Sequence, residues 1–406
     1  MKQALRERFL RYVAISSQSD ASATTVPSTP GQLELARLLA CELEALGLED
    51  VYIDAHGILT ARKPGNQPGA PRIGFVAHLD TVDVGISPDI HPQLVAFDGS
   101  DICLNADKDI WLRVAEHPEI TPYAGDEILV SDGTSVLGAD DKAAISVVMT
   151  LLANLPEVHG DIVVAFVPDE EIGLKGSKLL DLSRFPVDFA YTIDCCEQGE
   201  VVYETFNAAS VEIGIHGITA HPMSAKGVLV NPIRVAHDLI AHFDRTDTPE
   251  HTDGRDGYFW VTDMQANPNK ATLKMAIRDF DLASFEARKR YIGEVVALVG
   301  ARHPKARLEY RVDDVYANIV QSLGDDRRAI DLIFAGMAEL GIAPKVIAMR
   351  GGTDGSALSP RGVCTPNYFT GAHNFHSIYE FLPMQSFEKS YALTRRIVEL
   401  AATTRH

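Results

Sequence analysis

The chain has 406 residues, 46% of them hydrophobic, and a formal net charge of −19 at pH 7. This length favours two domains, because single cores seldom grow beyond ~250–300 residues. The acidic balance excludes nucleic acid and anionic membranes as expected partners, since both require concentrated Lys and Arg. No apolar run reaches the ~20 residues of a membrane helix, and the N-terminus lacks the apolar region of a signal peptide. The five cysteines form no redox or zinc motif, which predicts reduced thiols in a cytoplasmic protein.

The first 205 residues alternate helical and strand patterns, which predicts a mostly parallel sheet flanked by helices. A capping box with proline at the first helical position, Thr29-Pro30-Gly31-Gln32, predicts a helix that Gly47 ends. Val84 to Leu129 contains scattered prolines and short apolar runs, so we expect an irregular excursion over the sheet. The other predicted elements are the helix 2–14, the strands 51–54, 59–63, 73–77, 162–167 and 189–193, a strand from Ile128, and a long helix from Asp140.

The pattern changes near Thr205, where the order becomes strand, helix, strand, helix, strand. This order predicts a small antiparallel sheet with two helices on one face, inserted into the larger domain. Its predicted elements are 210–216, 228–243, 272–279, 285–299 and 307–312. The main domain resumes with the helix 328–340, the strand 345–348 and the helix 384–401. We therefore predict a main domain formed by residues 1–205 and 316–406, and an inserted domain at 206–315.

Apolar strand-like runs end in possible metal ligands at four places. These places are His78-Leu79-Asp80, Asp140-Asp141, Glu170-Glu171 and Asp194, and His376 lies near the C-terminus. Each has an ordinary explanation alone: a hydrogen-bonded core histidine, an N-cap pair, a solvated loop, or a helix-face pair of His376 and Glu380. Because parallel strands end at one sheet edge, the side chains are expected to converge. An uncompensated buried charge costs several kcal/mol, so the set together favours a metal site.

The kinds of side chain in this set narrow the choice of metal. Two divalent ions would balance most of the negative charge. Nitrogen and oxygen ligands without a thiolate suit Zn²⁺, and also Mn²⁺ or Co²⁺, better than Ca²⁺ or a closed structural zinc site. Two neighbouring ions activate water by lowering its pKa from 15.7 towards ~7. A serine hydrolase is disfavoured because the chain lacks a G-x-S-x-G motif.

Seven stretches over nearly the whole chain carry a specific combination of motifs: HLDT (78–81), LGADDKA (137–143), PDEEIG (168–173), YTID (191–194), FNAASV (206–211), IRDFD (277–281) and RGGTDG (350–355). In these the sequence resembles the peptidase T family, cytosolic aminotripeptidases among the co-catalytic di-zinc exopeptidases that include carboxypeptidase G, aminoacylase and the dipeptidases. The resemblance implies an α/β fold with a mixed sheet and an inserted α+β two-layer lid or dimerisation domain. It implies a homodimer, formed through that domain, that cleaves short peptides. A hydroxide bridging two ions would release the N-terminal residue of a tripeptide.

The resemblance also implies a role for each candidate metal ligand. Asp140 would bridge the two ions, and its peptide bond to Asp141 would be cis. His78 and Asp194 would complete the ligands of one ion. Glu171 and His376 would complete those of the other, with His373 as the competitor of His376.

Two carboxylates and a group of further residues are assigned to catalysis and substrate binding by the same resemblance. Asp80 would orient the ring of His78, and Glu170 would be the general base. His221, often supplied by the partner subunit, would stabilise the oxyanion. Asn231 and Arg278 would hold the substrate backbone. Arg350 would either clamp a carboxylate or form a salt bridge to Asp354.

Cys195-Cys196 depart from the family pattern, which has glycines after the aspartate. The pair indicates either a modified, oxidation-sensitive site or small buried residues beside the ligand. Two other functions stay open. One keeps the fold and metals in a dipeptidase or N-acyl-amino-acid deacylase. The other is a non-catalytic metal-binding scaffold, which would be expected to lack a base at Glu170.

Overall fold

The structure is a computed structural model, and it describes residues 1–403. The chain divides into two compact units, each with its own core. The first contains Met1–Tyr203, Ser322–Ile347 and the C-terminal part from Thr353, and the second contains Glu204–Gln321 with Ala348–Gly352. The predicted inserted segment, 206–315, falls within the second unit, to which the structure adds the short stretch Ala348–Gly352.

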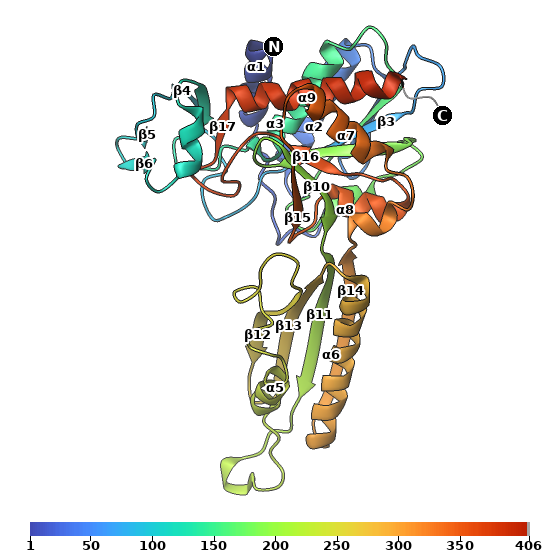
Figure 1. Ribbon diagram of the computed structural model, residues 1–406. Coiled ribbons are helices and arrows are strands. Elements are labelled where there is room, and N and C mark those ends of the chain that lie inside the picture. Colours follow the sequence, from blue (N-terminus) through green and yellow to red (C-terminus); the bar gives the residue numbers. More distant parts are fainter. Residues whose placement is uncertain (404–406) are drawn as a thin grey trace. The chain divides into compact units, whose positions relative to one another are not determined.

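The first unit is built on a mixed sheet, as predicted, and this sheet has eight strands (Figure 1). Its central strands β8, β3, β9 and β16 are parallel, while β1, β2 and β10 are antiparallel to their neighbours. In spatial order the strands are β1 (Glu49–Ile53), β2 (Leu59–Lys63), β8 (Ile162–Val167), β3 (Ile73–His78), β9 (Phe189–Cys195), β16 (Asn367–Phe369), β10 (Glu200–Thr205) and β15 (Lys345–Met349). Strands β3 and β8 are buried along their whole length, because helices cover both faces of a parallel sheet.

Helices pack on the sheet of the first unit. α3 contacts β3 and β9, and α1 and α9 pack against α3 on the same side (Figure 1). The short α8 contacts β9, and its Leu358 joins the apolar cluster of the other face with Val76 and Val163. The helices are α1 (Lys2–Val13), α2 (Pro30–Ala45), α3 (Ala139–Ala153), α4 (Lys175–Leu179), α7 (Arg328–Glu339), α8 (Asp354–Leu358) and α9 (Met384–Thr403), with a 3₁₀ turn η4 (Ser359–Arg361). No described helix has the length and apolarity needed to cross a membrane.

The expectation of an irregular excursion between Val84 and Leu129 is wrong. This segment forms strands and an apolar cluster of its own, containing Ile120 and Val130. Its elements are β4 (Gln93–Ala96), β5 (Ile102–Asn105), β6 (Ile110–Leu112), η1 (Pro118–Tyr123) and β7 (Glu127–Val130). β7 pairs with β4 and with β17 (Phe381–Pro383), so one of its partners lies far away in the sequence.

The second unit is a four-stranded antiparallel sheet with two helices packed against its apolar face. The strand order is β12 (Tyr258–Ala266), β13 (Lys270–Asp279), β11 (Asn207–His216) and β14 (Arg307–Tyr316), and the helices are α5 (Pro232–Ile240) and α6 (Leu282–Arg302). Short 3₁₀ turns lie at η2 (Pro222–Ser224) and η3 (Ile319–Ser322). The sequence patterns missed β12. It is an edge strand with exposed Trp260 and Met264, so its side chains do not alternate between buried and exposed.

Candidate metal centre

The carboxyl ends of β3, β8 and β9 carry His78, Glu170-Glu171 and Asp194, as adjacent parallel strands require. The element that positions Asp140 differs from the predicted one. The strand before it, β7, ends at Val130 and belongs to the three-stranded sheet. Asp140 lies in the first turn of α3 with non-helical backbone angles, two residues after the left-handed Gly138, and its peptide bond to Asp141 is cis.

The side chains form two groups that share Asp140. In the first, ligand atoms of His78, Asp140, Asp141 and Asp194 all lie within 4.8 Å of one another. In the second, the same limit encloses Asp140, Glu171 and His376. Oδ1 of Asp140 lies 2.8 Å from Nε2 of His78, whereas its Oδ2 lies 3.1 Å from Nε2 of His376. Each oxygen of one carboxylate therefore faces a different group, which is the geometry of a bridging ligand.

The exposure of the two groups differs. His78 and Asp140 are buried, while the side chain of His376 is 46% exposed. A small molecule can therefore approach the second group from solvent.

Burial and mutual repulsion raise the pKa values of several carboxyl groups here. The pKa values of Asp141, Glu170 and Asp194 are raised well above the ordinary range, first by burial and then by neighbouring carboxylates. The pKa of Glu171 is raised for the same reasons. Burial also opposes ionisation of Asp140, but hydrogen bonds from His376 and His78 outweigh it and hold its pKa well below the usual value. The hydrogen bond to Asp140 and the nearby carboxylate of Glu171 raise the pKa of His376 to about 10. So many carboxyl groups close together repel one another when ionised, and a nearby positive charge would relieve that repulsion.

Two buried carboxylate oxygens show how well the site would fit a metal. Among the described residues, Oδ1 of Asp141 and Oε1 of Glu171 have no hydrogen-bond partner. Oε1 of Glu171 lies 3.0 Å from Nε2 of His376 without hydrogen-bond geometry. Buried polar atoms are rarely left unpaired, because each costs ~1–3 kcal/mol. Buried carboxylate oxygens without hydrogen bonds, each in a group that also contains an imidazole, fit a pair of divalent cations.

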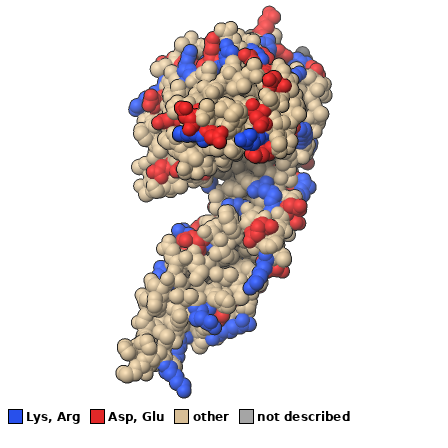
Figure 2. Space-filling view, turned by 90° about the vertical axis from the view of Figure 1, so that its left-hand side faces the viewer, with Lys and Arg blue, Asp and Glu red and all other residues tan. Residues whose placement is uncertain are grey.

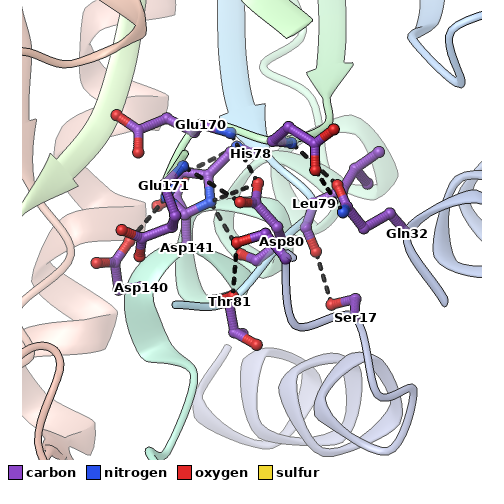
Figure 3. A network of polar contacts seen from close by, with 12 residues as sticks. Ser17, Gln32, His78, Leu79, Asp80, Thr81, Asp140, Asp141, Glu170 and Glu171 are labelled. Carbon is purple, nitrogen blue, oxygen red and sulfur yellow. Dashed lines mark hydrogen bonds and ion pairs between the residues drawn. The ribbon is translucent and has the colours of Figure 1, made fainter. Parts of the chain in front are cut away.

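The ring of His78 is held in the orientation that a metal ligand needs. Its Nδ1 lies 2.9 Å from the main-chain oxygen of Asp80, an acceptor, so Nδ1 carries the proton and Nε2 faces Asp140. The carboxylate of Asp80 is farther from Nδ1, at 3.6 Å. It accepts hydrogen bonds from the main-chain N–H groups of Glu170 and Glu171 at 3.0 and 3.2 Å (Figure 3). Asp80 thus contacts both His78 and the loop that carries Glu170 and Glu171, here called the glutamate loop.

A second contact that the sequence patterns missed holds the same loop. Asp169 is buried with a positive φ of 58°, and its carboxylate accepts hydrogen bonds from Ser28 and from the side-chain amide of Gln32. Gln32 also accepts the N–H of Asp169 (2.9 Å). The predicted capping box at Thr29 does not form, because the side chain of Gln32 is used here and Thr29 makes no side-chain cap. The main chain is therefore held at Asp169 by Gln32 and at Glu170 by Asp80, and these two contacts fix the position of Glu170.

His373, the competitor of His376, lies outside both groups. Its Nε2 is 2.7 Å from the hydroxyl of Tyr123, and its ring stacks on Phe381 with centroids 4.7 Å apart. Burial lowers its pKa to about 4. The structure brings His376, not His373, to Asp140.

The chain is similar over its full length to several curated proteins. It is 69% identical to a peptidase T-like protein of Yersinia pestis over 99% of this chain and 98% of that protein. It is 42% identical to peptidase T of Geobacillus kaustophilus over 98% of each. The chain belongs to the peptidase T family. Residues 203–307 of this family member also match the family model of the peptidase dimerisation domain.

Solved structures share the fold of this peptidase T family member. Aminopeptidase PepT from Bacillus cereus aligns with a TM-score of 0.76 at 22% identity, covering 99% of each chain. A dinuclear metal-binding peptidase of the M20 family from Bacillus subtilis aligns with a TM-score of 0.63 at 14% identity, covering 98% of each. The predicted α/β fold with its inserted domain is confirmed.

Two predicted substrate residues of this peptidase T family member begin helical segments in the second unit. His221 is exposed, and its Nδ1 accepts the N–H of Met223 at 3.2 Å, so its Nε2 carries the proton and can donate. The side chain of Asn231 caps α5 by accepting the N–H of Ile233 at 3.0 Å. The side-chain oxygen of Asn231 therefore already accepts a hydrogen bond within its own helix.

The two predicted arginines make local contacts in the second unit. Arg278 donates to the main-chain oxygens of Ile277 and Ala209, and its guanidinium lies 5.6 Å from the ring centre of Tyr316. Arg350 donates to the oxygen of Asp256 at 2.8 Å and to Thr252. These partners of Arg350 are main-chain and hydroxyl oxygens of the second unit, and none of them is a carboxylate.

Cys195 and Cys196 follow Asp194 directly, and all five cysteines of the chain are free thiols. Cys195 is buried, and burial raises its pKa well above the ordinary thiol value. Burial also raises the pKa of Cys196. Their main-chain oxygens accept the N–H groups of Thr370 and Gly371. Thiols with raised pKa values are poor nucleophiles, so these contacts favour a packing role.

Proposed function

We propose that the protein is a metal-dependent aminotripeptidase that releases the N-terminal residue from tripeptides. The observation that carries this proposal is Asp140, whose two oxygens face two separate groups of metal-ligand type. Full-length relatives named peptidase T support the same activity. The relatives at 69% and 59% identity are named peptidase T-like, so the substrate is the part of the proposal that most needs a direct test.

Two divalent ions would occupy these groups, with zinc as the expected metal and Mn²⁺ or Co²⁺ as replacements. His78, Asp140 and Asp194 would hold one ion, and Asp140, Glu171 and His376 the other. Bound there, the ions would polarise the scissile carbonyl and lower the pKa of water.

Glu170 would carry the proton during the reaction. Its carboxylate makes no hydrogen bond or ion pair with any other of residues 1–403, and it lies beside Glu171 at the end of β8. It would take a proton from the attacking water as the carbon–oxygen bond forms. It would then deliver that proton to the leaving nitrogen as the carbon–nitrogen bond breaks. Asp80 would keep Glu170 in place through the main-chain N–H groups of the glutamate loop.

The second unit would form a homodimer and contribute to substrate binding. Support comes from the match of residues 203–307 to the peptidase dimerisation domain. The free N–H of His221 would donate to the developing oxyanion, and Asn231, Arg278 and Arg350 would contact the peptide. A cytoplasmic location agrees with the free cysteines. The first unit displays acidic and basic side chains intermixed on the face seen in Figure 2, with no basic patch there for nucleic acid.

A substrate panel tests the proposal. The zinc-loaded protein is incubated with Ala-Ala-Ala, Ala-Ala, N-acetyl-Ala-Ala-Ala and N-acetylalanine, and the products are separated by chromatography. We expect free alanine and Ala-Ala from the unblocked tripeptide, and little reaction with the other three. Preference for Ala-Ala or for an acylated substrate would replace the proposal with a dipeptidase or a deacylase. Tight zinc binding without turnover of any peptide would favour a non-catalytic scaffold.

A further inference from the structure

Glu380 is a buried carboxylate outside the proposed ligand set. It lies at the end of the loop 371–380, which also carries His376, and the residue is 1% exposed. Its Oε2 accepts the main-chain N–H groups of Leu137 and Gly138 at 2.7 and 2.8 Å. Its Oε1 accepts the N–H of Asp140 at 3.1 Å. The sequence hypothesis of a helix-face pair with His376 is wrong, because the two residues lie in a loop rather than a helix.

These contacts connect the two segments that meet at the second group of ligands. Asp140 and Glu380 are 240 positions apart in the sequence, yet one carboxylate binds the main chain of Asp140 directly. In the sequence, Glu380 follows His376 by four positions. Movement of either segment would therefore change the separation between Asp140 and His376.

We propose that Glu380 is a positioning residue that sets the distance between Asp140 and His376 and thereby the affinity for the second ion. The inference rests on the proposed function, since it assumes the second ion. Three N–H groups converge on Glu380 in the manner of an anion-binding nest. A carboxylate accepts at both oxygens, whereas the amide of a glutamine would turn an N–H₂ group towards at least one of these donors.

The opposite end of the loop is held by a separate contact, so Glu380 acts on a loop with limited freedom. The side-chain amide of Asn374 donates to Glu119 at 2.7 Å and to the main-chain oxygen of Tyr379 at 3.3 Å. Asn374 and His376 both have positive φ values, 57° and 63°.

The test measures zinc affinity in Glu380→Gln, with Glu388→Gln as a control that removes a half-buried carboxylate from α9. Both zinc dissociation constants are obtained by competition with a chelating dye. We expect the weaker-bound ion of Glu380→Gln to lose ~10- to 100-fold in affinity, the usual effect of removing a residue that orients a ligand. Activity lost at limiting zinc should return at saturating zinc. The control should match the wild type.

Melting curves in chelator separate positioning from a purely structural role. Equal zinc affinities in Glu380→Gln and wild type, with a melting temperature lowered equally in chelator and in zinc, would overturn the proposal. If Glu380→Gln does not fold, Glu380→Asp keeps the charge but withdraws it by one methylene, and it should show the same selective loss. Failure of the wild type to bind two ions would instead overturn the proposed function, and this inference with it.

Discussion

Replacing Glu170 by glutamine removes the proposed proton acceptor while leaving its surroundings intact. The side chain is half-buried, and the residue is held through its main-chain N–H to Asp80 rather than through its carboxylate. Burial and the charges of Asp194, Asp354 and Glu171 already disfavour the ionised form, as its raised pKa shows. The substitution therefore removes an unfavourable charge, and we expect the variant to fold and bind metal as well as the wild type does.

The rate should fall far more than the structure changes. General acid–base catalysis by one positioned group contributes ~10²- to 10⁴-fold, which corresponds to about 3 to 5 kcal/mol of transition-state stabilisation. We expect that loss in kcat for Ala-Ala-Ala at saturating zinc, with KM little changed because Glu170 acts after binding. Metal content and melting temperature are measured on the same samples. Glu388→Gln, which removes a half-buried glutamate from α9, should keep full activity.

Activity of Glu170→Gln close to that of the wild type would refute its assignment as the base. A fall in activity that follows a fall in metal content would also refute it, because the glutamate would then be a ligand.

The remaining predictions concern the metals and the oxyanion. In the metal-free folded protein, Asp141, Glu170 and Asp194 keep protons that the unfolded chain releases near the ordinary pKa values of 3.8 to 4.5, so their contribution to the unfolding free energy falls as pH rises above about 4.5. Melting in chelator should therefore occur at a lower temperature near pH 7 than near pH 5.5, and saturating zinc should remove this difference. His376→Ala should lower the zinc content from two ions to one, whereas Asp140→Asn should weaken both ions, as atomic absorption can show; equal effects would contradict the bridging role. His221→Ala should reduce kcat with unchanged zinc content and melting temperature, and loss of zinc would argue for a different role.

The strand ends were predictable because burial and periodicity are local signals. Strands β3, β8 and β9 are largely apolar runs that lead to His78, Glu170 and Asp194, and parallel pairing then fixes where those residues meet. The prediction brought Asp140 to the site at the end of a strand, but in the structure it lies in the first turn of α3 and no strand leads directly to it. The approach through α3 depends on backbone angles that apolar spacing does not encode.

The missed features all depend on partners far away in the sequence or on solvent. β7 pairs with β17 through Val130 and Phe381, and no local pattern links those segments. β12 is an edge strand with exposed apolar side chains. The contact between Gln32 and Asp169 spans 137 positions, and that of Glu380 with Leu137 spans 243. Paired polar residues of this kind look like ordinary loop residues until the fold brings them together.

Anomalous diffraction from crystals of the zinc-loaded protein, recorded on both sides of the zinc absorption edge, tests the central claim most directly. We predict two anomalous peaks, one on each side of the Asp140 carboxylate, with His78 beside one and His376 beside the other. A single peak, or two peaks that do not share Asp140, would contradict the proposed metal centre.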